Sequence, residues 1–209
     1  MESEAKVASD KHEHYYTPKP TSEAKYGLVI SNLRGTEYEF LTCSGLFSWN
    51  EIDHGTWTLI KYMQVNPTDK VLDLGCGFGA IGLVAASLCP QGSVLLTDTN
   101  YRAVQVVRKN IDRLKTTNVK ARRSDLFAKI PEKFDTILTN PPISAGRETV
   151  YKFITESKEH LYPGGTLQLV ARHAKGGERL QEKIIEVFGN CEILGKSGGF
   201  RVYMGKNEH

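Results

Sequence analysis

From residue 70 onward the chain alternates between short apolar runs typical of buried strands and longer segments with helical spacing of apolar residues. This alternation predicts right-handed crossovers between parallel strands, since each helix must pack back onto the sheet. Only a few residues, "KSG", join the last two strand-like runs, so these should pair antiparallel. The sequence therefore predicts an α/β fold: a seven-stranded, mostly parallel sheet with an antiparallel last strand and helices on both faces.

The expected strands cover residues 70–75, 93–98, 119–124, 135–140, 165–172, 191–195 and 200–205. The expected helices cover 79–88, 100–115, 147–161 and 176–188, with a further short helix over 55–65. In "YEFLTCSGLFSW" (38–49), strand-forming residues flank Ser44 and Gly45, which predicts a hairpin with its turn at these two residues.

The domain organisation follows from this change of pattern. We expect residues 1–25 to form a polar N-terminal arm and residues 26–209 to form a single domain. Within that domain, a hairpin and helix over 36–66 precede the catalytic core over 67–209.

Composition narrows the class of protein. The net charge of +3 permits a nucleic-acid partner without requiring one. The four cysteines are far apart and form no C-x-x-C pair, so we expect reduced thiols rather than a disulfide framework or a metal site. No segment approaches the roughly 20 apolar residues of a membrane span. We therefore expect a cytoplasmic protein with no membrane or metal partner.

The loop "VLDLGCGFGAIG" (71–82) joins the first core strand to a helix through Gly75, Gly77 and Gly79. Glycines at such a place let the backbone turn sharply and approach a ligand closely, although a tight turn without a ligand has the same pattern. Asp73 precedes the first glycine by two residues. A carboxylate there would repel a pyrophosphate and suit a cationic ligand.

Two more acids follow the next two strands. Asp98 ends "LLTD", near the spacing expected of a ribose-binding acid, and Asp125 follows the third strand in "RSDLF". Each Asp alone is more often a helix N-cap. Three acids at the carboxyl ends of three successive strands predict a cleft for a nucleoside that carries positive charge.

The order "DLGCGFG", Asp98, "SDLF" and "TNPPI" resembles the class I S-adenosylmethionine-dependent methyltransferases, over about residues 44–205. The resemblance implies their Rossmann-like fold and S-adenosyl-L-methionine as cofactor. In that family the glycine loop passes beneath the methionine and ribose, and acids matching Asp98 and Asp125 take the ribose hydroxyls and the adenine amine. The cofactor-binding residues that it implies in this core are Asp73, Gly75, Cys76, Gly77, Gly79, Asp98, Thr99, Asp125, Leu126 and Asn140.

A narrower resemblance rests on "GLFSWNEIDHGT", "NPPISAGRE" and "GGFRVY". These segments are similar to the methyltransferase small-domain family, above all to its archaeal single-domain members. Its best-known members methylate the exocyclic amine of a guanine in small-subunit ribosomal RNA. The resemblance would place Phe47, Ser48, Asp53 and Gly55 on the cofactor. The residues alone favour a core aromatic at Phe47 and a helix cap at Asp53.

The segment "TNPPI" is the candidate catalytic loop, with Asn140, Pro141, Pro142 and Ile143. Two prolines stiffen the chain and hold the preceding residues extended. In the family this loop lies beside the transferred methyl group, so the Asn140 side-chain oxygen and the Pro141 carbonyl would accept the two N–H bonds of a substrate amine. Asn140→Asp keeps acceptor oxygens at this place and should retain part of the activity.

Related amine methyltransferases often carry an aromatic residue where this chain has Ile143. An aliphatic side chain stacks less specifically on a base, which disfavours adenine in DNA and glutamine in protein. The residues alone favour a core position for Phe200, and the alternative is that Phe200 supplies the missing ring.

The RNA contacts are expected around the same cleft. We expect Arg147, Arg172, Lys175 and Arg201 to meet phosphates, since they follow the fourth and fifth strands or lie in the final hairpin. We expect the basic segment 102–123 to form a solvent-exposed helix face at the edge of the sheet away from the candidate catalytic loop. The N-terminal "HYYTPKP" (14–20) fits an RNA contact, a lid over the cofactor or simple packing.

Three functions remain in view. The first is methylation of a nucleobase amine, most readily guanine in ribosomal or other structured RNA. The second is methylation of a glutamine side chain in a translation factor. The third is a non-catalytic RNA-binding protein with the same fold, against which the intact "NPP" and the three acids count. A nicotinamide-dependent dehydrogenase would leave Asp73 and this loop without a role.

The role of Asp98 can be tested directly. Asp98→Ala should weaken binding of S-adenosylmethionine by about 1–3 kcal/mol, because the ribose hydroxyls would lose a buried acceptor. Titration calorimetry measures this, and NAD should not bind to either protein. Equal affinity in the variant would remove Asp98 from the cofactor site.

Overall fold

The computed structural model describes residues 23–209, so the N-terminal arm expected over 1–25 and the segment 14–20 lie almost entirely outside the described residues. Its strands are β1 (Tyr26–Leu33), β2 (Thr36–Cys43), β3 (Lys70–Leu74), β4 (Ser93–Asp98), β5 (Val119–Arg123), β6 (Phe134–Thr139), β7 (Leu161–Arg172), β8 (Glu192–Ser197) and β9 (Phe200–Lys206). Its α-helices are α1 (His54–Tyr62), α2 (Ala80–Leu88), α3 (Tyr101–Arg113), α4 (Arg147–Glu159) and α5 (Gly177–Phe188).

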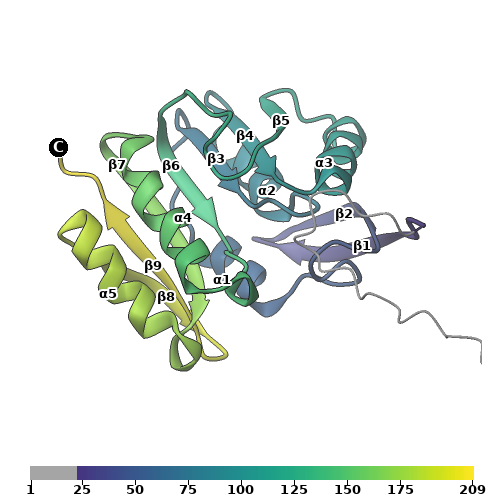
Figure 1. The fold of residues 1–209 in the computed structure, drawn as a ribbon. Coiled ribbons are helices and arrows are strands. Elements are labelled where there is room, and N and C mark those ends of the chain that lie inside the picture. Colours follow the sequence, from purple (N-terminus) through teal and green to yellow (C-terminus); the bar gives the residue numbers. More distant parts are fainter. Residues whose placement is uncertain (1–22) are drawn as a thin grey trace, which may run out of the picture.

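The large sheet has the order β5-β4-β3-β6-β7-β9-β8 (Figure 1). Strands β5, β4, β3, β6 and β7 are parallel, and β9 runs antiparallel to both β7 and β8. The seven-stranded, mostly parallel sheet with an antiparallel last strand is thus confirmed. The core strand and helix boundaries agree with the expected ones to within a few residues, and the expected strand over 165–172 begins earlier, at Leu161.

Each face of the sheet carries its own apolar cluster. One lies between the sheet and helices α1, α2 and α3, and the other lies beneath α4 and α5. Alternate residues of β3 divide between them, because successive side chains of a strand point to opposite faces. Val71 joins the first cluster, whereas Leu72 and Leu74 join the second. Helices on both faces are therefore confirmed.

The hairpin at the start of the described chain differs from the expected one. Strands β1 and β2 pair with each other, with Leu33 opposite Thr36, so the turn lies at Arg34 and Gly35 rather than at Ser44 and Gly45. Both turn residues have positive φ, 52° and 83°, as the tight hairpin turns that match strand twist require. Arg34 is an unusual residue for that conformation, and the sequence therefore gives no Asn-Gly type signal there.

Helix α1 is tied down at both ends. At its beginning, the Asp53 side chain accepts hydrogen bonds from the backbone N–H groups of Gly55 and Thr56, at 2.9 and 3.1 Å, which confirms the expected N-cap. At its end, the Arg34 guanidinium donates to backbone carbonyls, among them Ile60 at 3.0 Å and Met63 at 3.3 Å. These carbonyls lack partners within the helix, so the arginine satisfies them and joins the hairpin to α1.

All four cysteines are free thiols, with Cys43, Cys76 and Cys89 buried and Cys191 half-buried. None of the helices between residues 23 and 209 is long and apolar enough to cross a membrane. In the same part of the chain, no group of three or more His, Cys, Asp and Glu side chains could hold a metal ion.

Candidate active site

A cavity of about 820 Å³ lies at the carboxyl ends of β3, β4, β5 and β6. This is the edge where parallel α/β sheets bind their ligands, because the crossover loops diverge there. Its wall also includes residues of the segment between β2 and α1, residues of helices α1, α2 and α4, and the first residue of β9. The lining residues from the strand ends include Leu74, Gly75, Cys76, Gly77, Phe78, Thr97, Asp98, Thr99, Asn100, Ser124, Asp125, Leu126, Asn140, Pro141, Pro142 and Ile143.

The glycine loop is fixed by the neighbouring strand. The backbone N–H groups of Gly75 and Cys76 both donate to the carbonyl oxygen of Thr97, at 2.9 Å. Gly77 has a φ of 56°, and a Cβ added there would meet nothing within 4 Å, so the loop leaves space toward the cavity. Gly79 differs: a Cβ there would lie 3.1 Å from side chains of Leu83, Leu96 and Val107. Gly79 therefore serves helix packing and does not line the cavity.

Asp98 stands at the end of β4 and lines the cavity. One carboxylate oxygen accepts the N–H of Gly77 at 3.0 Å and the other accepts the N–H of Asn100 at 2.7 Å. Burial raises the pKa of this carboxyl to about 6, against the lowering effect of these backbone donors. The backbone N–H of Thr99 also interacts with this carboxylate, which has about four acceptor sites, so Asp98 can still accept from a ligand hydroxyl.

Asp73 occupies a different place from the one expected. Its side chain is fully buried on the α2 side of the sheet and does not line the cavity. One oxygen accepts the N–H of Gly82 at 2.8 Å, and the other, Oδ1, has no hydrogen-bond partner. Burial is the main cause that raises the pKa of Asp73 to about 7, and the charge of Asp98 adds to it. Its influence on a ligand is therefore electrostatic rather than by contact.

Asn140 follows β6 directly, and its position is fixed from two sides. The hydroxyl of the preceding Thr139 donates to the carbonyl oxygen of Leu74 at 2.8 Å, which holds the ends of β6 and β3 together. The Asn140 side-chain nitrogen Nδ2 donates to Thr56 Oγ1 at 3.0 Å and lies 3.3 Å from Asp53 Oδ1. Because Nδ2 faces Asp53 and Thr56, the side-chain oxygen of Asn140 faces away from these two residues. Pro141 is buried behind it.

The cavity brings together most of the site residues expected from sequence. Four of the expected cofactor residues do not line it: Ser48, Gly55, Asp73 and Gly79. Ser48 has a positive φ of 47° and belongs to a turn closed by a hydrogen bond from Glu51. The N–H of Gly55 is taken by Asp53. Phe47 is 43% exposed and lines the cavity, so the core position favoured by the residues alone is wrong.

Several lining residues gave no signal in the sequence. They include Leu46, Thr56, Phe78, Thr97, Asn100, Ser124 and Phe153. Thr56 is three residues after the cap Asp53, which places it in the first turn of α1. Phe200 is half-buried at the start of β9, where the Arg172 guanidinium lies 5.0 Å from its ring centre and the His54 ring lies 5.7 Å away. Phe200 also packs against the apolar cluster beneath α1, α2 and α3, so it combines a place at the core with a place in the cavity wall.

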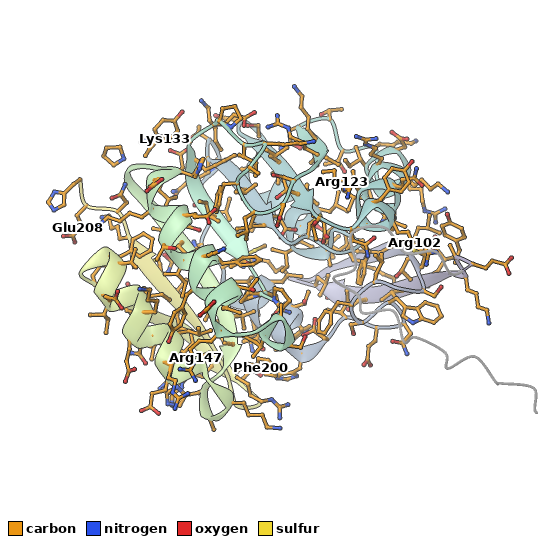
Figure 2. The ribbon with its side chains drawn as sticks, in the orientation of Figure 1. Arg102, Arg123, Lys133, Arg147, Phe200 and Glu208 are labelled. Carbon is orange, nitrogen blue, oxygen red and sulfur yellow. The ribbon has the colours of Figure 1, made fainter. Side chains whose placement is uncertain are left out.

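Of the four expected phosphate contacts, Arg147, Arg172 and Lys175 are exposed and Arg201 is half-buried. Arg147 and Phe200 lie at the same end of the molecule, near the start of α4 and the turn between β8 and β9 (Figure 2).

The basic segment 102–123 forms α3 and the edge strand β5, away from that end (Figure 1). Two of its arginines form ion pairs, Arg113 with Glu39 and Arg122 with Glu132.

Comparisons with known proteins agree with this geometry. The model of the family described as methyltransferase small domain matches residues 37–204. An uncharacterized Bacillus subtilis protein, YbxB, is 35% identical, over 93% of this chain and 98% of its own length. Ribosomal RNA small subunit methyltransferase C of Hamiltonella defensa is 36% identical, over 80% of this chain. The chain spans about half the length of that relative, 50%.

Among solved structures, the Thermus thermophilus 16S rRNA N2 G1207 methyltransferase, in complex with AdoMet and guanosine, matches with a TM-score of 0.78. It is 24% identical, and the match covers 90% of this chain and 52% of that one. A methyltransferase from Pyrococcus furiosus matches with a TM-score of 0.62 at 22% identity, over 70% of this chain and 78% of that one. At these identities the two structures establish the fold.

The buried Asp73 should leave a signature in the pH dependence of stability. An acid whose pKa is raised on folding contributes stability that is fully present below its ordinary pKa of 3.8 and is lost as pH rises through about 7. Asp73→Asn keeps the acceptor for Gly82 and removes the charge. At pH 8 the variant should be more stable than the wild type, by at most about 4 kcal/mol.

Thermal unfolding of both proteins between pH 4 and 8, without ligand, measures this difference. The Asp98 carboxyl contributes to both curves in the same direction and therefore acts as an internal reference. Parallel curves for the two proteins would contradict the assignment of a buried, charged Asp73.

Proposed function

Because the chain belongs to the methyltransferase small domain family, we propose that it uses S-adenosylmethionine to methylate the exocyclic amine of guanine in ribosomal RNA. The observation that carries the proposal is Asn140. Its amide nitrogen is held by Asp53 and Thr56, and its side chain lines the cavity beside the carboxyl ends of β3 and β4. The relatives named as ribosomal RNA methyltransferases support the choice of RNA.

The cavity fits the cofactor in charge and in hydrogen bonding. Asp98 would accept the ribose hydroxyls, and Asp125, exposed at the end of β5, would accept the adenine amine. S-adenosylmethionine supplies a methyl group on a positively charged sulfur. The orphaned, buried Oδ1 of Asp73 lies beneath the glycine loop, and a cation in the cavity would favour its ionised form.

An exocyclic amine of a base is a weak nucleophile, since its lone pair is delocalised into the ring. Two acceptors can correct this, because they hold both N–H bonds and favour a pyramidal nitrogen whose lone pair faces the methyl group. The Asn140 side-chain oxygen and the Pro141 carbonyl are these acceptors. Preorganised acceptors and positioning would then provide the rate, without a side-chain base of high pKa. The bond between sulfur and methyl would break as the bond to nitrogen forms, which leaves a neutral thioether, and the cationic nitrogen would then lose one proton to water.

The base itself requires a flat apolar contact. Phe200 and Ile143 both line the cavity, and Ile143 is 46% exposed. We assign them to the two sides of the target base, with Phe200 as the aromatic surface that the loop itself lacks. A Cβ at residue 55 would lie 3.0 Å from the Phe200 ring, so Gly55 leaves room for that ring at the cavity wall.

A glutamine side chain also presents an NH₂ group, and a similar loop could hold it. The surroundings of the cavity favour a polyanion instead. Arg147, Arg172 and Lys175 are exposed. Arg147 begins α4, Arg172 ends β7, and Lys175 lies three residues beyond it. The Arg172 guanidinium lies 5.0 Å from the ring centre of Phe200, which lines the cavity, so this charge stands beside the cavity wall. We therefore propose phosphate contacts for these three residues and for Arg201.

Replacement of Asn140 tests the proposed chemistry. Asn140→Ala removes one acceptor of the substrate amine and should slow single-turnover methyl transfer about a hundred- to a thousandfold, as for a lost oxyanion-hole donor. Affinity for S-adenosylmethionine should change by less than about tenfold, because a single neutral side chain at the site edge contributes little to it. Transfer of labelled methyl to RNA measures the first, and calorimetry measures the second.

Asn32→Ala, at an exposed position of β1, is the matched control and should transfer methyl at the wild-type rate. Mass spectrometry of nucleosides, from cells with and without the gene and from the reaction, should identify a methylated guanosine. A methylated adenosine would contradict the guanine assignment, and wild-type turnover in Asn140→Ala would contradict the role of the loop.

The phosphate contacts predict the salt dependence of RNA binding. Neutralising Arg147 or Arg172 with Gln should weaken binding and lower the slope of log affinity against log salt by about one each. Lys120→Gln, on the edge strand β5, should leave the slope unchanged. If Lys120→Gln lowers the slope and the other two variants do not, RNA binds to the opposite edge of the sheet.

A further inference from the structure

Three contacts join the catalytic loop to the first turn of α1. The Asn140 Nδ2 atom lies 3.3 and 3.4 Å from the two carboxylate oxygens of Asp53 and 3.0 Å from Thr56 Oγ1. These partners precede Asn140 by 87 and 84 residues and belong to a different element of the fold. The contacts therefore arise from the packing of α1 against the sheet.

The partners themselves are held firmly. Asp53 Oδ1 caps α1 through the N–H groups of Gly55 and Thr56. Gly55 and Thr56 are buried, with Thr56 at 9% exposure. A Cβ on Gly55 would lie 3.0 Å from both the Asp53 carboxylate and the Phe200 ring, so little space remains for movement in this turn. The acceptors for the Asn140 amide are thus preorganised.

A side-chain amide has a donor end and an acceptor end, which can exchange places by rotation. An ionised carboxylate only accepts, so Asp53 favours the orientation in which Nδ2 of Asn140 faces α1. The opposite orientation would bring Oδ1 toward the carboxylate and turn Nδ2 toward the substrate. A donor in that place would face the N–H bonds of the substrate amine and could not hold it.

We propose that Asp53 and Thr56 are positioning residues that fix the orientation of the Asn140 amide, so that its oxygen faces the substrate amine. The inference rests on the proposed function, and it assigns Asp53 to the catalytic loop rather than to the cofactor. It also changes the expectation for Asn140→Asp. A carboxylate at residue 140 would lie against that of Asp53, where the two like charges repel each other.

A reciprocal exchange tests the proposal. Asn140→Asp alone should lower the single-turnover rate about a hundredfold or more, since its acceptor is repelled from its place. In the double variant Asp53→Asn/Asn140→Asp, the new amide keeps its oxygen on the helix cap and offers its NH₂ to the new carboxylate. The double variant should therefore recover at least about tenfold over Asn140→Asp, the usual size of coupling between groups in direct contact.

Asp53→Asn alone should be slower than the wild type, because an NH₂ group then opposes the Nδ2 of Asn140. Rescue by the exchange is a result that a merely structural role of Asp53 would not give. If the double variant is no faster than Asn140→Asp, the proposal fails.

Thr56 provides a second, milder test. Thr56→Val has nearly the same shape and lacks the acceptor, so kcat should fall about three- to tenfold, as for one lost hydrogen bond. The KM for RNA and the affinity for S-adenosylmethionine should stay within about twofold of the wild-type values. Thr56→Ser restores the hydroxyl and should restore kcat. A loss of cofactor affinity with unchanged kcat in Thr56→Val or Asp53→Asn would place these residues on the cofactor and overturn the proposal.

A measurement without substrate separates this inference from the proposed function. In ¹H–¹⁵N spectra of the protein alone, the side-chain NH₂ of Asn140 should exchange slowly with solvent, and Thr56→Val should speed that exchange. Fast exchange in the wild type would overturn the positioning role even if the RNA is methylated. Slow exchange in a protein that methylates no RNA would overturn the proposed function alone.

Discussion

Hydrogen bonds between the ends of neighbouring strands hold the cavity in one arrangement. The carbonyl oxygen of Thr97 receives two N–H groups of the glycine loop, and that of Leu74 receives the hydroxyl of Thr139. These bonds fix the ends of β4, β3 and β6 relative to one another. Each of the three ends carries one part of the proposed chemistry, so the relative position of cofactor and substrate is set by the sheet rather than by flexible loops.

Charge is distributed unevenly around this edge. Asp73 and Asp98 lie at the ends of β3 and β4, and burial raises the pKa of both carboxyls. Three exposed cations lie beyond them: Arg147 begins α4, Arg172 ends β7, and Lys175 follows β7 by three residues. Under the proposed function, a cationic cofactor would therefore be drawn to the acidic strand ends, and an anionic nucleic acid to the basic residues outside the cavity.

The sequence predicted the sheet well, because strand and helix periods were regular from residue 70 onward. The glycine loop, Asp98 and the loop over residues 140–143 do line one cavity, as their local signals indicated. The turn at Arg34–Gly35 was missed because Arg34 lacks the residue preference for positive φ. The contact between Thr56 and Asn140 depends on how α1 packs against the sheet. A local sequence pattern cannot predict a contact between residues that are 84 positions apart. Asp73 was expected at the cavity but is buried on the α2 side of the sheet, because the sequence of a strand does not show whether a side chain near its end is buried or faces a ligand.

Because Asn140 is attached to α1, the loop that contains it can be divided into two parts. One part orients the Asn140 amide, and the other forms the surface that would meet the substrate. In the proposed mechanism, the Asn140 side-chain oxygen is oriented by α1, a helix that Arg34 and Asp53 hold at its two ends. The residues beyond Pro142, from Ile143 to Ala145, form a short 3-10 turn with no buried side chain. Substitutions in this turn can reshape the surface that meets the substrate while the amide stays in place. A change of target would then require changes only at the exposed Ile143 and Ser144, with the position of the amide conserved.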